Sequence, residues 1–166
     1  MKGFRPFFAG AALFAILSMG VWMATYLFQW PIPLAGMPIF QWHAHEMIFG
    51  YAMAVIAGFL LTAAPNWTGE KAINGFPLAI LLMLWVIARL LMLNGPQLLP
   101  IAAVADLLFM LGLALAVTRP VLKARQKRQA PVLLVIAGLI VANSMFYLGA
   151  MGFLVNGVWI GTYAGL

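Results

Sequence analysis

Long apolar stretches alternate with short polar segments along the whole chain. An α-helix needs about 20 apolar residues to cross the hydrocarbon core of a bilayer. The predicted spans are residues 7–28, 47–65, 76–93, 99–117 and 132–154, and residues 157–166 begin a further apolar segment that is too short to cross. The alternation typical of barrel strands is absent. The pattern therefore predicts an all-α, polytopic integral membrane bundle with about five transmembrane helices plus a partial sixth.

The segments between these spans are short and rich in helix breakers. They contain Pro31, Pro33, Gly36 and Pro38 before the second span, Gly69 and Gly75 before the third, and Asn94, Gly95 and Pro96 before the fourth. Short connections make sequential helices antiparallel neighbours. We expect a single helical domain over residues 1–166. Because the chain ends inside an apolar segment, we also expect a fragment of a longer protein.

Basic residues predict the orientation of this bundle. Residues 119–131 carry five basic residues and no acid, which the positive-inside rule assigns to the cytoplasm. Counting back through the spans, the N-terminus with Lys2 and Arg5 falls on the same side, and so does the 66–75 segment with Lys71. The N-terminus is therefore predicted to be cytoplasmic.

Composition narrows the class of protein. The chain is 66% hydrophobic and only 7% charged, so it lacks the polar surface of a water-soluble protein, and its partner is the lipid bilayer. The net charge of +6 comes from residues between apolar runs, where they set topology, so we expect no nucleic-acid binding. With no cysteine in the chain, disulfides, thiolate metal sites and thiol nucleophiles are excluded. His, Glu, Met and Tyr remain as ligands for a metal or heme.

The few polar residues inside the spans are predicted to share one depth. Residues 41–46 lie at the outer end of the second span, and Arg89 and Asp106 lie roughly 6–10 Å below the same surface. Charges inside a membrane are costly and usually face a partner, so an Arg89–Asp106 ion pair is expected. In the alternatives, Arg89 extends to the interface while backbone or water holds Asp106, or Glu46 is the partner of Arg89. Asn143 is an expected interhelical hydrogen-bond donor or acceptor.

Two histidines lie within this outer group. His43 and His45 are two residues apart, so on a continuous helix they point about 200° apart and do not bind one ion together. His43 shares a helix face with Glu46, and a carboxylate can orient an imidazole that binds heme iron or copper. The competing interpretation is a pair of interfacial histidines beside Trp42, with Glu46 as a first-turn acid favoured by the helix dipole.

Several blocks of the sequence resemble the NnrS family. These are FRPFF at 4–8, WHAHEMIFGY at 42–51, AVIAGFLLTAAPNWTG at 54–69, the third span with Arg89, and RPVLKARQKR at 119–128. Members are bacterial polytopic membrane proteins that contain heme and copper and are associated with the response to nitric oxide. The resemblance covers nearly the whole chain. It implies a multi-pass protein of the bacterial inner membrane, with heme and copper as cofactors and nitric oxide as a ligand.

The resemblance also implies site residues. His43 and His45 are similar in position to the histidines expected to hold the metals, with Glu46 beside them, and the resemblance does not choose which histidine takes iron or copper. Members typically have more helices, so this chain resembles an N-terminal portion, and the remaining half or a second copy is an expected partner. Relatives carry a histidine where this chain has Tyr147, at the end of ANSMFY. Tyrosine can bind heme iron, so Tyr147 is a candidate ligand and a bis-histidine site is in doubt.

Three classes of function follow from these features. The leading one is a heme- and copper-binding protein that lowers nitric oxide stress; nothing beyond the metals indicates catalysis, so the sequence leans against an enzyme. The second is a small-molecule or ion transporter that uses Arg89 and Asp106. The third is a structural or assembly protein in which the buried charges pair helices.

Overall fold

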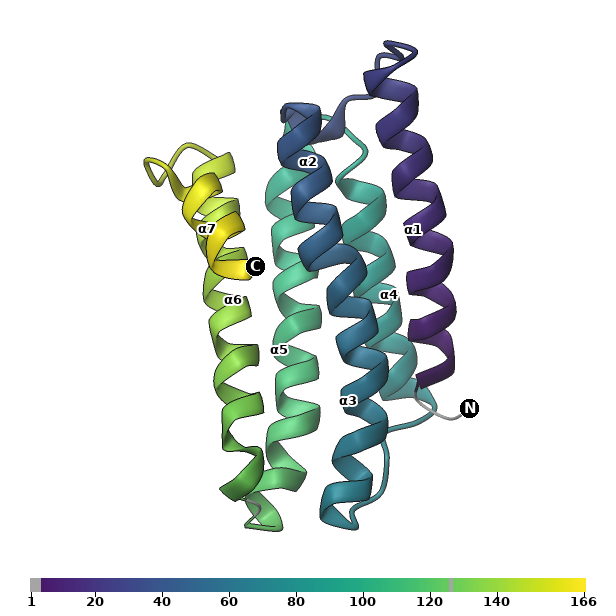
Figure 1. The fold of residues 1–166 in the computed structure, drawn as a ribbon, viewed down its shortest axis with the longest axis vertical. Helices are drawn as coiled ribbons and strands as arrows, with labels where there is room; N and C mark the ends of the chain where they lie inside the picture. Colours follow the sequence, from purple (N-terminus) through teal and green to yellow (C-terminus); the bar gives the residue numbers. More distant parts are fainter. Residues whose placement is uncertain (1–3, 126) are drawn as a thin grey trace.

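The computed structural model describes residues 4–125 and 127–166, in which every regular element is helical (Figure 1). The α-helices are α1 (Phe4–Tyr26), α2 (Ile39–His45), α3 (Met53–Thr68), α4 (Phe76–Leu91), α5 (Leu99–Lys123), α6 (Ala130–Ala150) and α7 (Gly157–Gly165). Three short 3₁₀ turns cover Leu34–Gly36 (η1), Pro96–Leu98 (η3) and Lys127–Gln129 (η4), and a π-helical segment, η2 (Glu46–Ala52), joins α2 to α3. The predicted all-helical class is confirmed for the described residues.

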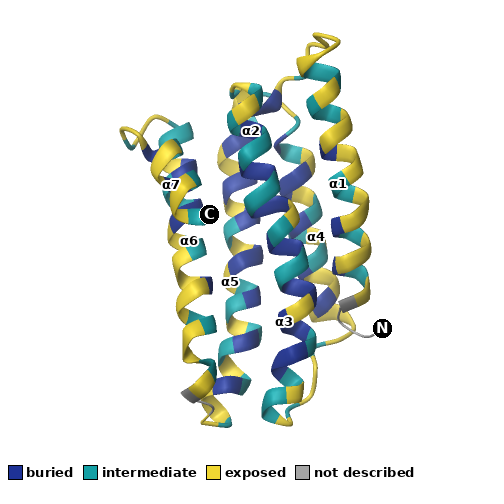
Figure 2. Ribbon diagram, viewed as in Figure 1, coloured by how far each residue is buried: buried dark blue, intermediate teal, exposed yellow. Residues whose placement is uncertain are grey.

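Four of the helical segments are long and apolar enough to cross a membrane. They are Arg5–Tyr26, Ile39–Thr68, Pro96–Lys123 and Ala130–Ala150, whereas α4 has 16 residues and is shorter than the usual crossing length. Much of α1 and α6 is exposed (Figure 2), and the exposed residues include large apolar ones: Ile16 is 72% exposed and Leu134 is 73% exposed. Continuous apolar exposure of this kind fits lipid as the surrounding solvent. The chain is therefore a membrane protein, and the expected fifth crossing remains a prediction.

The helix that contains the predicted second span is longer than that span. It starts at Ile39, directly after Pro38, and continues through η2 to Thr68, whereas the apolar pattern predicts a span from residue 47. The bounds of the span stay a prediction, because the polar residues at 41–46 interrupt the apolar run without ending the helix. In the structure this stretch is part of the helix, and its polar side chains are enclosed by other helices.

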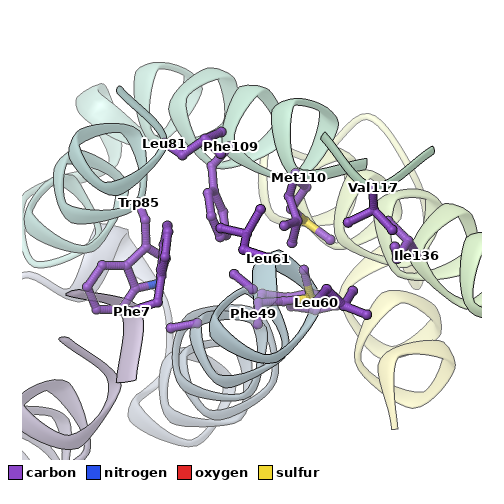
Figure 3. Packing of buried hydrophobic residues seen from close by; sticks show 14 of the residues in the cluster. Phe7, Phe49, Leu60, Leu61, Leu81, Trp85, Phe109, Met110, Val117 and Ile136 are labelled. Atoms are coloured by element: carbon purple, nitrogen blue, oxygen red, sulfur yellow. The ribbon is translucent and has the colours of Figure 1, made fainter. Parts of the chain in front are cut away.

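The helices pack into a bundle with α3 and α5 at its centre. α1 packs on α3 at one edge, α4 packs on α5, and α6 lies against α5 at the opposite edge with α7 folded back on it (Figure 1). Large apolar side chains from α1, η2, α3, α4, α5 and α6 converge between them (Figure 3). Phe7 stacks on Phe109 at 5.8 Å, and Phe14 meets Trp85 edge to face at 5.6 Å between ring centroids. This core brings α1, α4 and α5 together below the polar residues.

The connections at each end of the bundle contact one another. At one end, the Ala35 N–H donates to the Asn94 carbonyl at 2.6 Å and ties η1 to the α4–α5 connection. At the other end, Lys123 and Glu70 form a 2.7 Å ion pair between α5 and the α3–α4 connection. The start of α1 and the α5–α6 connection also lie at this second end (Figure 1). Five basic residues near chain connections therefore share it: Arg5, Lys71, Arg119, Arg125 and Arg128. The cytoplasmic placement of that end stays a prediction.

Two glycines allow α7 to lie directly on α6. Gly157 and Gly161 are spaced by four residues and face the backbone of α6, and small residues at this spacing permit close approach of membrane helices. A Cβ atom on Gly161 would lie 2.5 Å from the Ala142 carbonyl oxygen and the Phe146 nitrogen. Both neighbours are backbone atoms, so they have little freedom to move away.

Gly161→Ala is expected to detach α7 from α6 without unfolding the bundle. Overpacking against backbone typically costs about 1–3 kcal/mol, and a nine-residue helix at the end of the chain can absorb that cost by local opening. Hydrogen exchange of the α7 amides should become faster. Gly138→Ala, on α6 with no atom within 4 Å of its new Cβ, is the control and should leave exchange unchanged. Equal protection of α7 in both variants would contradict the glycine contact.

Candidate functional site: a buried polar centre

Six buried polar residues form one cluster among the helices, called here the polar centre. None is more than 4% exposed. The members are His45 from α2, Glu46 from η2, Arg89 from α4, Asp106 from α5, and Asn143 and Tyr147 from α6. The polar centre includes two of the three acidic residues of the chain. It therefore joins residues from four separate helical segments.

Arg89 holds both carboxylates of the polar centre. Its Nη1 donates to Glu46 Oε1 at 3.0 Å, and its Nη2 lies 2.7 Å from Asp106 Oδ1. The second contact is an ion pair without hydrogen-bond alignment. The Arg89–Asp106 pair and the alternative Arg89–Glu46 pair therefore occur together, which a planar guanidinium with five N–H donors makes possible.

The other half of the polar centre closes the contacts into a ring. His45 Nδ1 lies 2.9 Å from Glu46 Oε1, and His45 Nε2 lies 3.0 Å from Asn143 Oδ1. Asn143 Nδ2 then donates to Asp106 Oδ2 at 3.0 Å. The ring runs from Arg89 through Glu46, His45, Asn143 and Asp106 back to Arg89.

The hydrogen-bond pattern fixes the role of His45. Because Asp106 accepts from Asn143 Nδ2, the amide oxygen of Asn143 must face the His45 ring. Both His45 ring nitrogens therefore face oxygen atoms of the polar centre. Because both nitrogens have partners in the protein, neither is free to bind a metal as the ring is folded.

Tyr147 and the surrounding aromatic rings close the polar centre. The Tyr147 hydroxyl donates to Asp106 Oδ2 at 3.1 Å. The His45 ring centroid lies 4.3 Å from that of Phe146 and 5.2 Å from those of Phe49 and Tyr147. Within the described residues, no group of three or more His, Asp or Glu is arranged to hold a metal ion. As folded, the ring does not fit a heme iron or copper.

His43 lies apart from the ring and has a free nitrogen. Its imidazole packs on Trp22 of α1, with 5.5 Å between ring centroids, and its buried Nδ1 has no hydrogen-bond partner. Trp22 Nε1 and Thr25 Oγ1 on α1 are also buried without partners. The two histidines thus point to different neighbours, as helix geometry requires. Glu46, expected beside His43, bonds to His45 instead.

Gly50 and Trp85 help to position the polar centre, a role that the sequence did not predict for them. A Cβ on Gly50 would lie 2.7 Å from Arg89 Nη1, so the absent side chain leaves the path of the guanidinium open. Trp85 Nε1 donates to the Gly50 carbonyl at 2.9 Å and ties η2 to α4. π-helical turns inside longer helices are frequent at functional sites. The only sequence signal for these roles was Gly50 within the polar-rich QWHAHEMIFG stretch.

Comparison with known proteins gives one match. The family model described as "NnrS protein" matches residues 1–166, the full length of the sequence. No curated protein and no solved structure matches the chain.

Proposed function

The chain belongs to the NnrS family, and on this premise we propose a multi-pass protein of the bacterial inner membrane that binds heme or copper in the response to nitric oxide. The observation that carries the metal assignment is the buried Nδ1 of His43, which has no partner in the protein. A neutral imidazole nitrogen of this kind is a common ligand for heme iron and copper. Binding, rather than catalysis, is the activity we propose.

The two histidines take different roles in this proposal. His43 is the ligand, and Trp22 covers one face of its imidazole. His45, Glu46 and Tyr147 are committed to the polar centre, so we propose that they hold the helix of His43 in place instead of binding the metal. His43 is two residues from His45. A rigid polar centre therefore also fixes the orientation in which His43 Nδ1 faces the metal.

The proposal requires more donors than His43 supplies. One imidazole does not complete the coordination of iron or copper. We propose that a second copy of the chain, or the remaining half of a longer protein, supplies the others. When bound, the metal offers the coordination position at which nitric oxide binds, while residues of this chain orient and shield the imidazole.

Metal loading of the purified full-length protein tests the role of His43. His43→Ala is expected to lower the affinity for heme or copper by more than the roughly 10–100-fold that loss of a supporting partner costs. Heme absorbance and copper electron paramagnetic resonance measure the loss. His45→Gln, compared per folded protein, is the control and should retain the metal. Loss of metal in His45→Gln but not in His43→Ala would overturn the assignment.

The ring itself favours a second role in helix assembly. Each of its contacts except that between the neighbours His45 and Glu46 joins different helical segments. Transport through Arg89 and Asp106 has less support, because both charges are paired and enclosed. Solute flux into proteoliposomes that disappears with Asp106→Asn would favour the transporter instead.

A further inference from the structure

A pocket of about 470 Å³ lies between α4 and α5 at the basic end of the bundle. It is far from the polar centre along the helices, since its lining ends at Leu81 on α4 and begins at Gly112 on α5. Its walls are apolar and include Ile80 and Leu115, which are 43% and 52% exposed. The pocket is therefore open to the lipid-facing surface of the bundle.

The rim of this pocket carries an excess of positive charge. Lys71, Arg119 and Lys123 line it together with one acid, Glu70. Glu70 is 2.7 Å from Lys123 in an ion pair. Among the described residues, Lys71 and Arg119 have no carboxylate within ion-pair distance, so two cations face the pocket without a counter-ion.

The apolar walls and the two unpaired cations of the pocket together favour one kind of ligand. A phosphate-bearing anion would satisfy the unpaired cations, and basic pockets between membrane helices at the interface bind anionic lipid headgroups. A free phosphate would leave the apolar walls unused, whereas an acyl chain fits them. We propose that this pocket binds an anionic phospholipid, with the headgroup phosphate at Lys71 and Arg119 and an acyl chain along Ile80 and Leu115.

The positive-inside rule alone does not account for this arrangement. Topology depends on how many basic residues lie near the ends of spans and not on where their side chains point. Arg125 and Arg128 belong to the same basic connection but do not line the pocket. Variants at Arg125 and Arg128 can therefore distinguish lipid binding in the pocket from a general attraction of anionic lipid to the basic connection.

Native mass spectrometry of the full chain in detergent, with added phosphatidylglycerol or phosphatidylcholine, tests the proposal. We expect retained phosphatidylglycerol adducts that become on the order of 30-fold weaker in Lys71→Gln/Arg119→Gln, because each interfacial cation contributes about fivefold. Both side chains are exposed, so the fold should survive, and circular dichroism checks this.

The control variant Arg125→Gln/Arg128→Gln removes the same charge outside the pocket and should keep the adduct. Equal weakening in both variants would show attraction by the whole basic connection and overturn the proposal. Competition by soluble glycerol phosphate as strong as that by intact phosphatidylglycerol would identify a free-phosphate site and overturn the lipid assignment. Equal retention of phosphatidylcholine would also overturn it.

Discussion

Arg89→Met is expected to lower the free energy of unfolding by about 3–5 kcal/mol, the usual cost of removing one partner from a buried ion pair. Glu46 and Asp106 both depend on Arg89, through contacts of 3.0 and 2.7 Å. Without the guanidinium, two enclosed carboxylates lose their shared cationic partner. Unfolding of the purified protein in mixed micelles, followed by circular dichroism, measures the change.

Two further variants distinguish charge pairing from packing. Arg128→Met removes an exposed cation and should change stability by no more than about 0.5 kcal/mol. Adding Asp106→Asn to Arg89→Met should recover part of the loss, because one uncompensated charge disappears, with a coupling energy of roughly 0.5–3 kcal/mol. A loss in Arg89→Met no larger than in Arg128→Met would contradict the ring.

The apolar pattern predicted most of the fold because a run of about 20 apolar residues is excluded from water. Runs such as 99–117 face either the bundle interior or hydrocarbon, and Pro38 and Gly75 each precede the first residue of a helix. The pattern did not predict that the helix includes residues 39–46, because hydropathy does not distinguish a polar residue in a connection from one enclosed by neighbouring helices. The contact of α7 with α6 through Gly157 and Gly161 was not predicted from the apolar pattern, and the expectation that residues 157–166 begin a further apolar segment stays a prediction.

The sequence was sufficient to predict that residues of the polar centre lie close together. It was not sufficient to predict which hydrogen bonds they form. Equal depth in adjacent antiparallel helices was sufficient to place Arg89 near Asp106. The bridging of His45 and Asp106 by Asn143 depends on how α6 is rotated toward α5, which the residue order does not report. A rotation of one helix face would exchange Asn143 for an apolar neighbour.

The different surroundings of His43 and His45 could not be predicted from the sequence either. Both occur in one short motif, and helix geometry predicts that they face different neighbours without predicting what those neighbours are. Only the packing of α1 on α2 places Trp22 against His43, and only the packing of α6 places Phe146 and Asn143 against His45. The asymmetry of the site therefore arises from tertiary contacts and not from the motif.

Gly50→Ala is expected to lower the free energy of unfolding by about 2–4 kcal/mol, which combines overpacking with a weakened buried ion pair. The new Cβ would lie 2.7 Å from Arg89 Nη1 and 2.8 Å from Phe14 Cε1. Since Phe14 is held edge to face by Trp85, the guanidinium must move away from Glu46. Unfolding in mixed micelles measures the loss.

Gly20→Ala provides the matched control for this change. Gly20 is also in a helix, and no atom lies within 4 Å of its new Cβ, so alanine should be neutral or slightly stabilising there. In the background of Arg89→Met, Gly50→Ala should cost less than in the native chain, because the displaced group is absent and methionine is flexible. An undiminished cost in that background would assign the strain to Phe14 alone and would mean that Gly50 does not position Arg89.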